Sequence, residues 1–142
     1  MGESAAFKAF VDEVEATIAA ARPIDALGEF VDELAEVVRE LEATTDELIK
    51  VRDAGEVTLF LANASIYLDT FGHIVIAWIW LMQAIAAAPK ADAGSAAERN
   101  FYRGKLRACR YFYRYELNKV PERLSLLSLA DDTCMTMDEA WF

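Results

Sequence analysis

Residues 23–50, PIDALGEFVDELAEVVRELEATTDELIK, decide the fold. Apolar side chains recur there at alternating spacings of three and four, a heptad rhythm in which Thr45 is the one polar member. The members are Ile24, Leu27, Val31, Leu34, Val38, Leu41, Thr45 and Leu48. Such a stripe must pack against another helix at a shallow crossing angle. The pattern therefore predicts a long bundle helix with Pro23 in its first turn and Gly55 just after its end.

Three other segments carry the helical period. The four expected helices cover residues 3–21, 23–52, 57–88 and 97–118. Residues 57–88 are apolar nearly all round, which is typical of the central helix of a core. Four helices with short connections fold most simply as an all-α, antiparallel up-down four-helix bundle. We expect a single domain over residues 1–142, with Pro121 ending the fourth helix, a short helix at 122–130 and a tail at 131–142.

The most apolar run in the chain is Ile74–Met82, IVIAWIWLM. It is nine residues long, with Asp69 and His73 just before it, whereas a membrane span needs about 20 apolar residues. We therefore expect a core segment and no membrane span. The expected core positions are Trp78, Ile79, Leu81 and Met82 in this region and Leu34, Val38 and Leu41 in the heptad stripe.

The composition excludes several classes of protein. The chain has 24 acidic and 14 basic residues and a net charge of −10, which argues against nucleic acid as a partner. A single histidine, His73, argues against most zinc sites and the di-iron bundles. Cys109 and Cys134 stand far apart and form no disulfide framework. With no secretory signal at the N-terminus, we expect a cytoplasmic protein.

Asp69 and His73 are four residues apart and therefore share a helical face. Two interpretations stay open: a catalytic or metal-binding pair, and a hydrogen-bonded polar pair closed by Tyr67 or by an arginine from the fourth helix. Four glutamates on one face of the second helix form a solvated or salt-bridged flank. They are Glu29, Glu33, Glu36 and Glu40.

An arginine stripe is the most distinctive charge pattern. Its members, at spacings of four, four, three and four, are Arg99, Arg103, Arg107, Arg110 and Arg114. The stripe could pair with the glutamates of the second helix, dock an acidic partner, or bind the phosphates of a nucleotide or of coenzyme A.

The tail ends in two large aromatic residues, Trp141 and Phe142, which follow several acidic residues. Aromatic side chains of this size are costly to leave in water. The tail is expected either to fold back on its own bundle or to anchor in a groove of another domain or subunit. In the second case its acids would meet Arg99 or Arg103.

Some packing motifs resemble a known family. The residues concerned are Tyr67, Leu68, Phe71 and Gly72, the tryptophans after them, and Phe101, Tyr102 and Lys105 at the start of the fourth helix. They are similar to the C-terminal extension of a subgroup of bacterial acyl-CoA dehydrogenases, that of the 3-methylmercaptopropionyl-CoA dehydrogenase-like enzymes. The resemblance covers residues 7–142 and concerns the extension alone.

The resemblance implies FAD in the full-length enzyme, held by core domains that this chain does not contain. It assigns no catalytic, cofactor-binding or metal-binding residue here, and we expect no activity from this chain alone. The leading hypothesis is an auxiliary domain that packs on the dehydrogenase core or on a neighbouring subunit. Two alternatives stay open: a free-standing helical module that forms dimers, and a small bundle that binds acyl-CoA.

Overall fold

The computed structural model describes residues 5–142, and no strand occurs among them. The prediction of an all-α fold is confirmed. The α-helices are α1 (Ala5–Ala21), α2 (Gly28–Asp53), α3 (Val57–Leu61), α4 (Ala64–Ala87), α5 (Ala96–Tyr115) and α6 (Val120–Ser128). Short 3₁₀ turns connect or follow them: η1 (Asp25–Leu27), η2 (Ala88–Lys90), η3 (Leu117–Lys119) and η4 (Glu139–Trp141).

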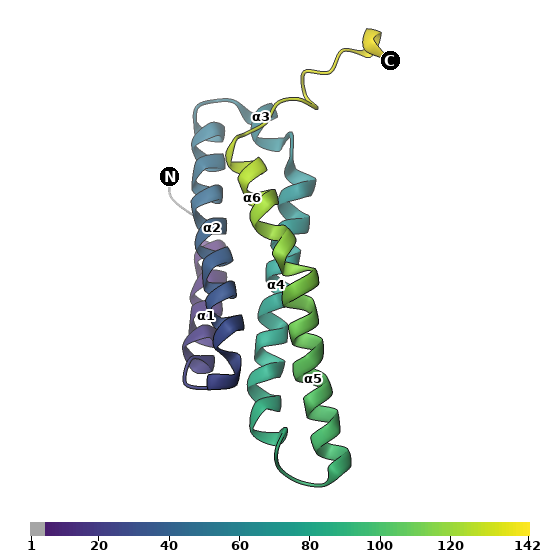
Figure 1. Ribbon diagram of the computed structural model, residues 1–142. Helices are drawn as coiled ribbons and strands as arrows, with labels where there is room; N and C mark the ends of the chain where they lie inside the picture. Colours follow the sequence, from purple (N-terminus) through teal and green to yellow (C-terminus); the bar gives the residue numbers. More distant parts are fainter. Residues whose placement is uncertain (1–4) are drawn as a thin grey trace.

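The long helices lie side by side, and the chain reverses direction between them (Figure 1). Helix α1 contacts α2 and α4, α4 contacts α5, and α6 contacts both α2 and α4. Helices α5 and α6 together form one bent rod beside α4 (Figure 1). The connection from α2 through α3 and the start of the tail meet at the same end of the molecule (Figure 1).

The heptad stripe of α2 lies in the core as predicted. Leu34, Val38 and Leu41 are buried. Thr45, the polar member, donates from its Oγ1 to the Leu41 carbonyl oxygen (2.7 Å) and lies 2.8 Å from the Tyr67 hydroxyl. Its hydroxyl is therefore satisfied at the edge of the apolar seam, where an unpaired polar group would be costly.

Helix α4 packs on one side only, which corrects the expected core. Leu81 is buried, but Ile79 and Met82 are 45% and 49% exposed and Trp78 is half-buried. The residues of α4 that are buried recur at helical spacing, so the opposite face stays uncovered. Helix α4 thus has two apolar faces. One is buried in the core, and the other is exposed.

The bounds of the helices differ from the expected ones where the chain has to turn. Residues 25–27 form a 3₁₀ turn, so α2 begins at Gly28 and not at Pro23. The expected continuous helix over 57–88 is broken before α4, where the Asn63 side chain donates to the Asp131 carbonyl oxygen (2.9 Å). The first part of the expected helix at 3–21 lies outside the described residues.

The fourth predicted helix also ends early. Helix α5 stops at Tyr115, and the 3₁₀ turn after it redirects the chain so that α6 packs on α2. Pro121 does not end a helix: it lies in the first turn of α6, where its missing N–H costs nothing. At its other end, α5 begins with a capping box, in which Ser95 and Glu98 bind each other's backbone N–H.

Candidate functional site

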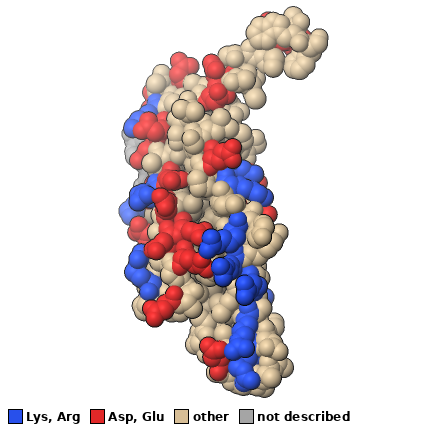
Figure 2. All heavy atoms as spheres, in the orientation of Figure 1, with Lys and Arg blue, Asp and Glu red and all other residues tan. Residues whose placement is uncertain are grey.

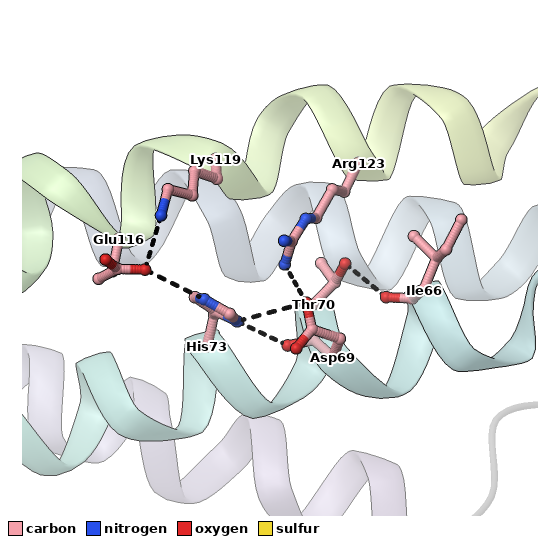
Figure 3. Close-up of polar contacts among 7 residues, drawn as sticks. All are labelled: Ile66, Asp69, Thr70, His73, Glu116, Lys119 and Arg123. Carbon is pink, nitrogen blue, oxygen red and sulfur yellow. Dashed lines mark hydrogen bonds and ion pairs between the residues drawn. The ribbon is translucent and has the colours of Figure 1, made fainter.

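A polar network joins α4 to the bend between α5 and α6 (Figure 3). The Arg123 guanidinium donates to the Asp69 carboxylate. His73 Nδ1 lies 2.8 Å from the Asp69 carbonyl oxygen, and its Nε2 lies 3.6 Å from Glu116 Oε2. Lys119 Nζ donates to the same Glu116 oxygen (2.9 Å). The arginine that closes the Asp69–His73 pair thus comes from α6 and not from the fourth helix, and Tyr67 binds Thr45 instead.

The contact with the Asp69 carbonyl oxygen requires a hydrogen on Nδ1 of His73. A carbonyl oxygen only accepts, so Nδ1 carries the hydrogen that it shares with Asp69. Lys119 is the main reason that the pKa of the Glu116 carboxyl lies below its usual value. Among residues 5–142 no hydroxyl or thiol group is hydrogen-bonded to His73. The network therefore fastens three elements together, and it offers no activated nucleophile.

The arginine stripe runs along α5 beside an acidic cluster (Figure 2). Arg114 Nη2 donates to Glu29 Oε2 (2.5 Å), and Arg110 Nε lies 3.9 Å from the other oxygen of that carboxylate. The stripe thus meets one of the four glutamates of α2, as one of the three interpretations expected. Glu33 is next along that face, and partial burial raises the pKa of its carboxyl.

The remaining arginines lie toward the start of α5. Arg103 Nη2 donates to Asp92 Oδ1 (2.7 Å), and Arg99 Nη1 donates to the Gly94 carbonyl oxygen (2.5 Å). Arg107 forms no hydrogen bond or ion pair within the part of the chain that the structure describes. A hollow of about 310 Å³ lies here between α5 and the start of α2, and Arg103, Arg107 and Arg110 line it together with Glu29.

Two buried groups in the core serve packing. Burial raises the pKa of the Cys109 thiol to about 12, so the thiolate is absent at neutral pH and the residue is inert. The Tyr113 hydroxyl donates to the Ala77 carbonyl oxygen (3.0 Å) and ties α5 to α4. Residues 5–142 contain no cluster of three His, Cys, Asp or Glu side chains that could hold a metal ion.

The outer face of α4 is an exposed apolar surface. Ile76, Ile79 and Met82 point away from the core along it. By length and composition Ala64–Lys90 is long and apolar enough to cross a membrane, and 28% of its most apolar window is buried. The helix nevertheless contacts α1, α2, α5 and α6. The expectation that it does not span a membrane stays a prediction.

An apolar groove of about 690 Å³ opens at the end of the molecule where α3 lies. Side chains from α1, α2, α3, α4 and α6 line it. They include Phe7, Phe10, Leu48, Phe60, Leu68 and Phe71, and Arg52 is the one charged residue among them. None of these residues belonged to a predicted site, because the groove forms where five elements meet.

The tail leaves the bundle at that same end (Figure 1). Trp141 and Phe142 are 72% and 96% exposed, so the prediction that the tail folds back on its own bundle is wrong. Within one chain Arg99 and Arg103 lie at the far end of α5 and bind Gly94 and Asp92, so their contact with the acids of a tail from another subunit stays a prediction. Whether these aromatics anchor in another domain or subunit stays a prediction.

A comparison with models of known protein families gives a match over most of the chain. Residues 10–138 match the family described as "Acetyl-CoA dehydrogenase C-terminal like". The chain belongs to this family. A relative in this comparison is the broad-specificity linear acyl-CoA dehydrogenase FadE5 of Mycobacterium tuberculosis. It is 31% identical to this chain over 77 residues. That alignment spans 54% of this chain and 13% of FadE5, so the chain corresponds to a small part of that relative's length.

The family match confirms the resemblance to an acyl-CoA dehydrogenase C-terminal domain. The narrower resemblance, to the 3-methylmercaptopropionyl-CoA dehydrogenase-like subgroup, stays a prediction. The domain presents three features that a partner could use: the arginine stripe, the outer face of α4, and the groove with the tail beside it. Sequence reasoning found the first and part of the third. The sequence held no signal for the second, because a helix that is apolar all round shows no preferred face.

Proposed function

We propose that this chain is the auxiliary C-terminal domain of an FAD-dependent acyl-CoA dehydrogenase. The observation that carries the proposal is the family match over residues 10–138. In such an enzyme the flavin and the groups that oxidise the CH–CH bond of an acyl-CoA belong to core domains. This domain contributes a binding surface that packs on that core or at the interface between subunits.

The outer face of α4 is the surface best suited to that packing. Ile76, Ile79 and Met82 form an apolar row on a helix whose other side is already buried in the bundle. Exposed apolar patches of this kind mark interaction sites. Beside the face, on the α5 side, Lys105 Nζ lies 5.9 Å from the centre of the Trp80 ring and 5.6 Å from that of Phe101, which adds an aromatic rim.

The proposal is tested first at the level of the gene and the purified enzyme. We expect a flavin-binding dehydrogenase core to be encoded in frame before Met1 or by a neighbouring gene. Co-expressed with that core, the domain should co-purify with a yellow FAD protein that oxidises acyl-CoA. Turnover of acyl-CoA by the isolated chain supplied with FAD would overturn the auxiliary role.

The packing surface is tested by a charge placed on it. Ile79→Asp should release the domain from the core, or dissociate the subunits, because a carboxylate in an apolar interface loses its hydration. Leu126→Asp is the matched control, since Leu126 is exposed to a similar extent but lies on α6. Equal retention of both variants on the core, measured by size-exclusion chromatography, would remove the α4 face from the proposal.

A further inference from the structure

The tail carries apolar surface that the rest of residues 5–142 leaves exposed. Trp141 and Phe142 are the last two residues of an arm that starts at Asp131. Two turns at its base give the arm its direction: the Thr133 N–H donates to Asp131 Oδ1 (3.1 Å) and the Thr136 N–H to the Asp132 carbonyl oxygen (2.9 Å). The arm therefore points away from its own bundle (Figure 1).

The groove at the same end is the complementary feature. It is lined by aromatic and aliphatic side chains, and two of its lining residues, Asn63 and Leu127, lie beside the start of the arm. Asn63 itself donates to the Asp131 carbonyl oxygen. An apolar arm and an apolar groove that no other part of residues 5–142 fills thus share one end of the molecule.

We infer that the arm of one copy inserts Trp141 and Phe142 into the groove of a second copy, and that the second copy returns its own arm in the same way. The result is a homodimer with twofold symmetry, held by reciprocal exchange of residues 131–142. Exchange of an identical element between protomers is a low-cost route to a dimer. The inference does not depend on docking to a flavoenzyme core.

The geometry permits a reciprocal exchange. Each arm begins next to its own groove, so a twofold axis through this end brings each groove within reach of the other arm. Residues 132–142 span at most roughly 40 Å when extended. An arm of that length crosses a contact between two bundle ends without any change inside the helices.

The buried area is sufficient for a stable dimer. A large aromatic side chain buries roughly 150–250 Å². Two exchanged arms bury four such side chains and a similar area of groove surface, which amounts to roughly 1,200–2,000 Å². Specific protein interfaces of standard size bury that much surface.

The charges also favour the arm of a second copy as the segment that fills the groove. Asp138 and Glu139 precede the two aromatics, and Arg52 is the one charged residue that lines the groove. With the aromatics inside, these carboxylates lie at the mouth of the groove. There they compete for the Arg52 guanidinium with Asp53, to which Arg52 Nη2 donates in the single chain (2.8 Å). A peptide with acidic residues before a pair of aromatics fits this lining better than an uncharged chain does.

Sedimentation of the full chain tests the exchange. We expect a dimer that becomes at least about 100-fold weaker in the double variant Trp141→Ala/Phe142→Ala. The matched control replaces another pair of exposed aromatics, Tyr111→Ala/Tyr115→Ala on α5, and should leave the dissociation constant unchanged. A wild-type chain that stays monomeric at several hundred micromolar, or equal weakening by both double variants, would overturn the inference.

The groove is tested separately from the arm. Leu68 lines it and is 68% exposed, so Leu68→Asp should leave folding intact and weaken the dimer about as much as loss of the aromatics. Leu126→Asp, exposed on α6 and outside the groove, is the control, and Ile76→Asp reports on the outer face of α4. If Ile76→Asp dissociates the dimer and Leu68→Asp does not, the outer face of α4 is the dimer interface and the exchange is refuted.

Crosslinking identifies whose groove the arm fills. A photo-reactive phenylalanine analogue at position 142 is irradiated in an equal mixture of ¹⁴N- and ¹⁵N-labelled chains. We expect mixed-isotope crosslinks from position 142 to residues 59–71. Crosslinks within one chain alone, crosslinks outside the groove, or a lipid bound to the purified chain in native mass spectra in place of the arm would each overturn the exchange.

Discussion

Ala130 is the residue at which the chain leaves α6 for the tail. It follows α6 with φ at +47°, in the left-handed region that favours glycine. The chain leaves the last turn of α6 through this conformation, as at many helix C-termini. At this position a residue other than glycine adopts a strained backbone conformation, and the tail begins directly after it.

Ala130→Gly is expected to stabilise the fold by about 0.5–1 kcal/mol. An L-residue in this region costs about 1–2 kcal/mol, and the extra freedom of glycine in the unfolded chain takes back part of the gain. Ala54→Gly is the control, because Ala54 ends α2 with φ at −74° and gains nothing from glycine. Urea unfolding measures both, and a stabilisation by Ala54→Gly equal to that of Ala130→Gly would contradict the role of φ.

The two cysteines should differ sharply in reactivity. Burial raises the pKa of Cys109 to about 12, whereas Cys134 is exposed on the tail. Since the thiolate is the reactive form, a chromogenic disulfide reagent at pH 8 should titrate one thiol in the folded protein and two in urea. Rapid reaction of both thiols in the native state would show that the α4–α5 contact opens readily.

Glu33 should make stability depend on pH. Burial, opposed by Arg114, raises the pKa of its carboxyl above the unfolded value, so the folded state binds a proton more tightly. The destabilisation is absent below the unfolded pKa of about 4.5 and develops as pH rises through the folded pKa. Glu33→Gln should therefore stabilise the protein by a fraction of a kcal/mol at pH 7 and not at pH 3.5. A change in the free energy of unfolding that is the same at the two pH values would contradict this role of Glu33.

At the scale of elements, substitutions on the buried and the exposed faces of the bundle helices should change the free energy of unfolding by different amounts. Leu41 on α2 is fully buried, and Leu41→Ala should cost about 2–5 kcal/mol because it leaves a cavity. Ile79 on the outer face of α4 is nearly half exposed, and Ile79→Ala should cost less than about 1 kcal/mol. Denaturant unfolding of the isolated chain compares them, and similar losses would mean that the outer face of α4 is covered even in the monomer.

At the scale of the whole molecule, the bundle should be independent of its tail. Removal of residues 134–142 should leave the far-UV helical signal intact and change the unfolding free energy of the monomer by less than about 1 kcal/mol, since these residues are exposed. Loss of the cooperative transition on truncation would show that the tail supports the fold. Comparison at low protein concentration separates this effect from any loss of the dimer.

Local pattern determined much of this protein. The heptad stripe from Leu27 to Leu48 placed α2 in the core, and the helical period along the chain predicted an all-α fold. These features depend on residues three or four apart, which a sequence displays directly. The Arg99–Arg114 stripe was visible for the same reason, although its partner Glu29 was one of several candidates.

Tertiary structure decided what lies between elements. The period of α4 did not reveal that Ile79 and Met82 face outward, because an all-round apolar helix shows no preferred face. Arg123 reaches Asp69 from 54 residues away, and the groove forms only where α1, α2, α3, α4 and α6 converge. Such contacts depend on the orientation of each helix relative to its neighbours. Packing across the whole bundle sets these orientations, and residues close together in the sequence do not reveal them.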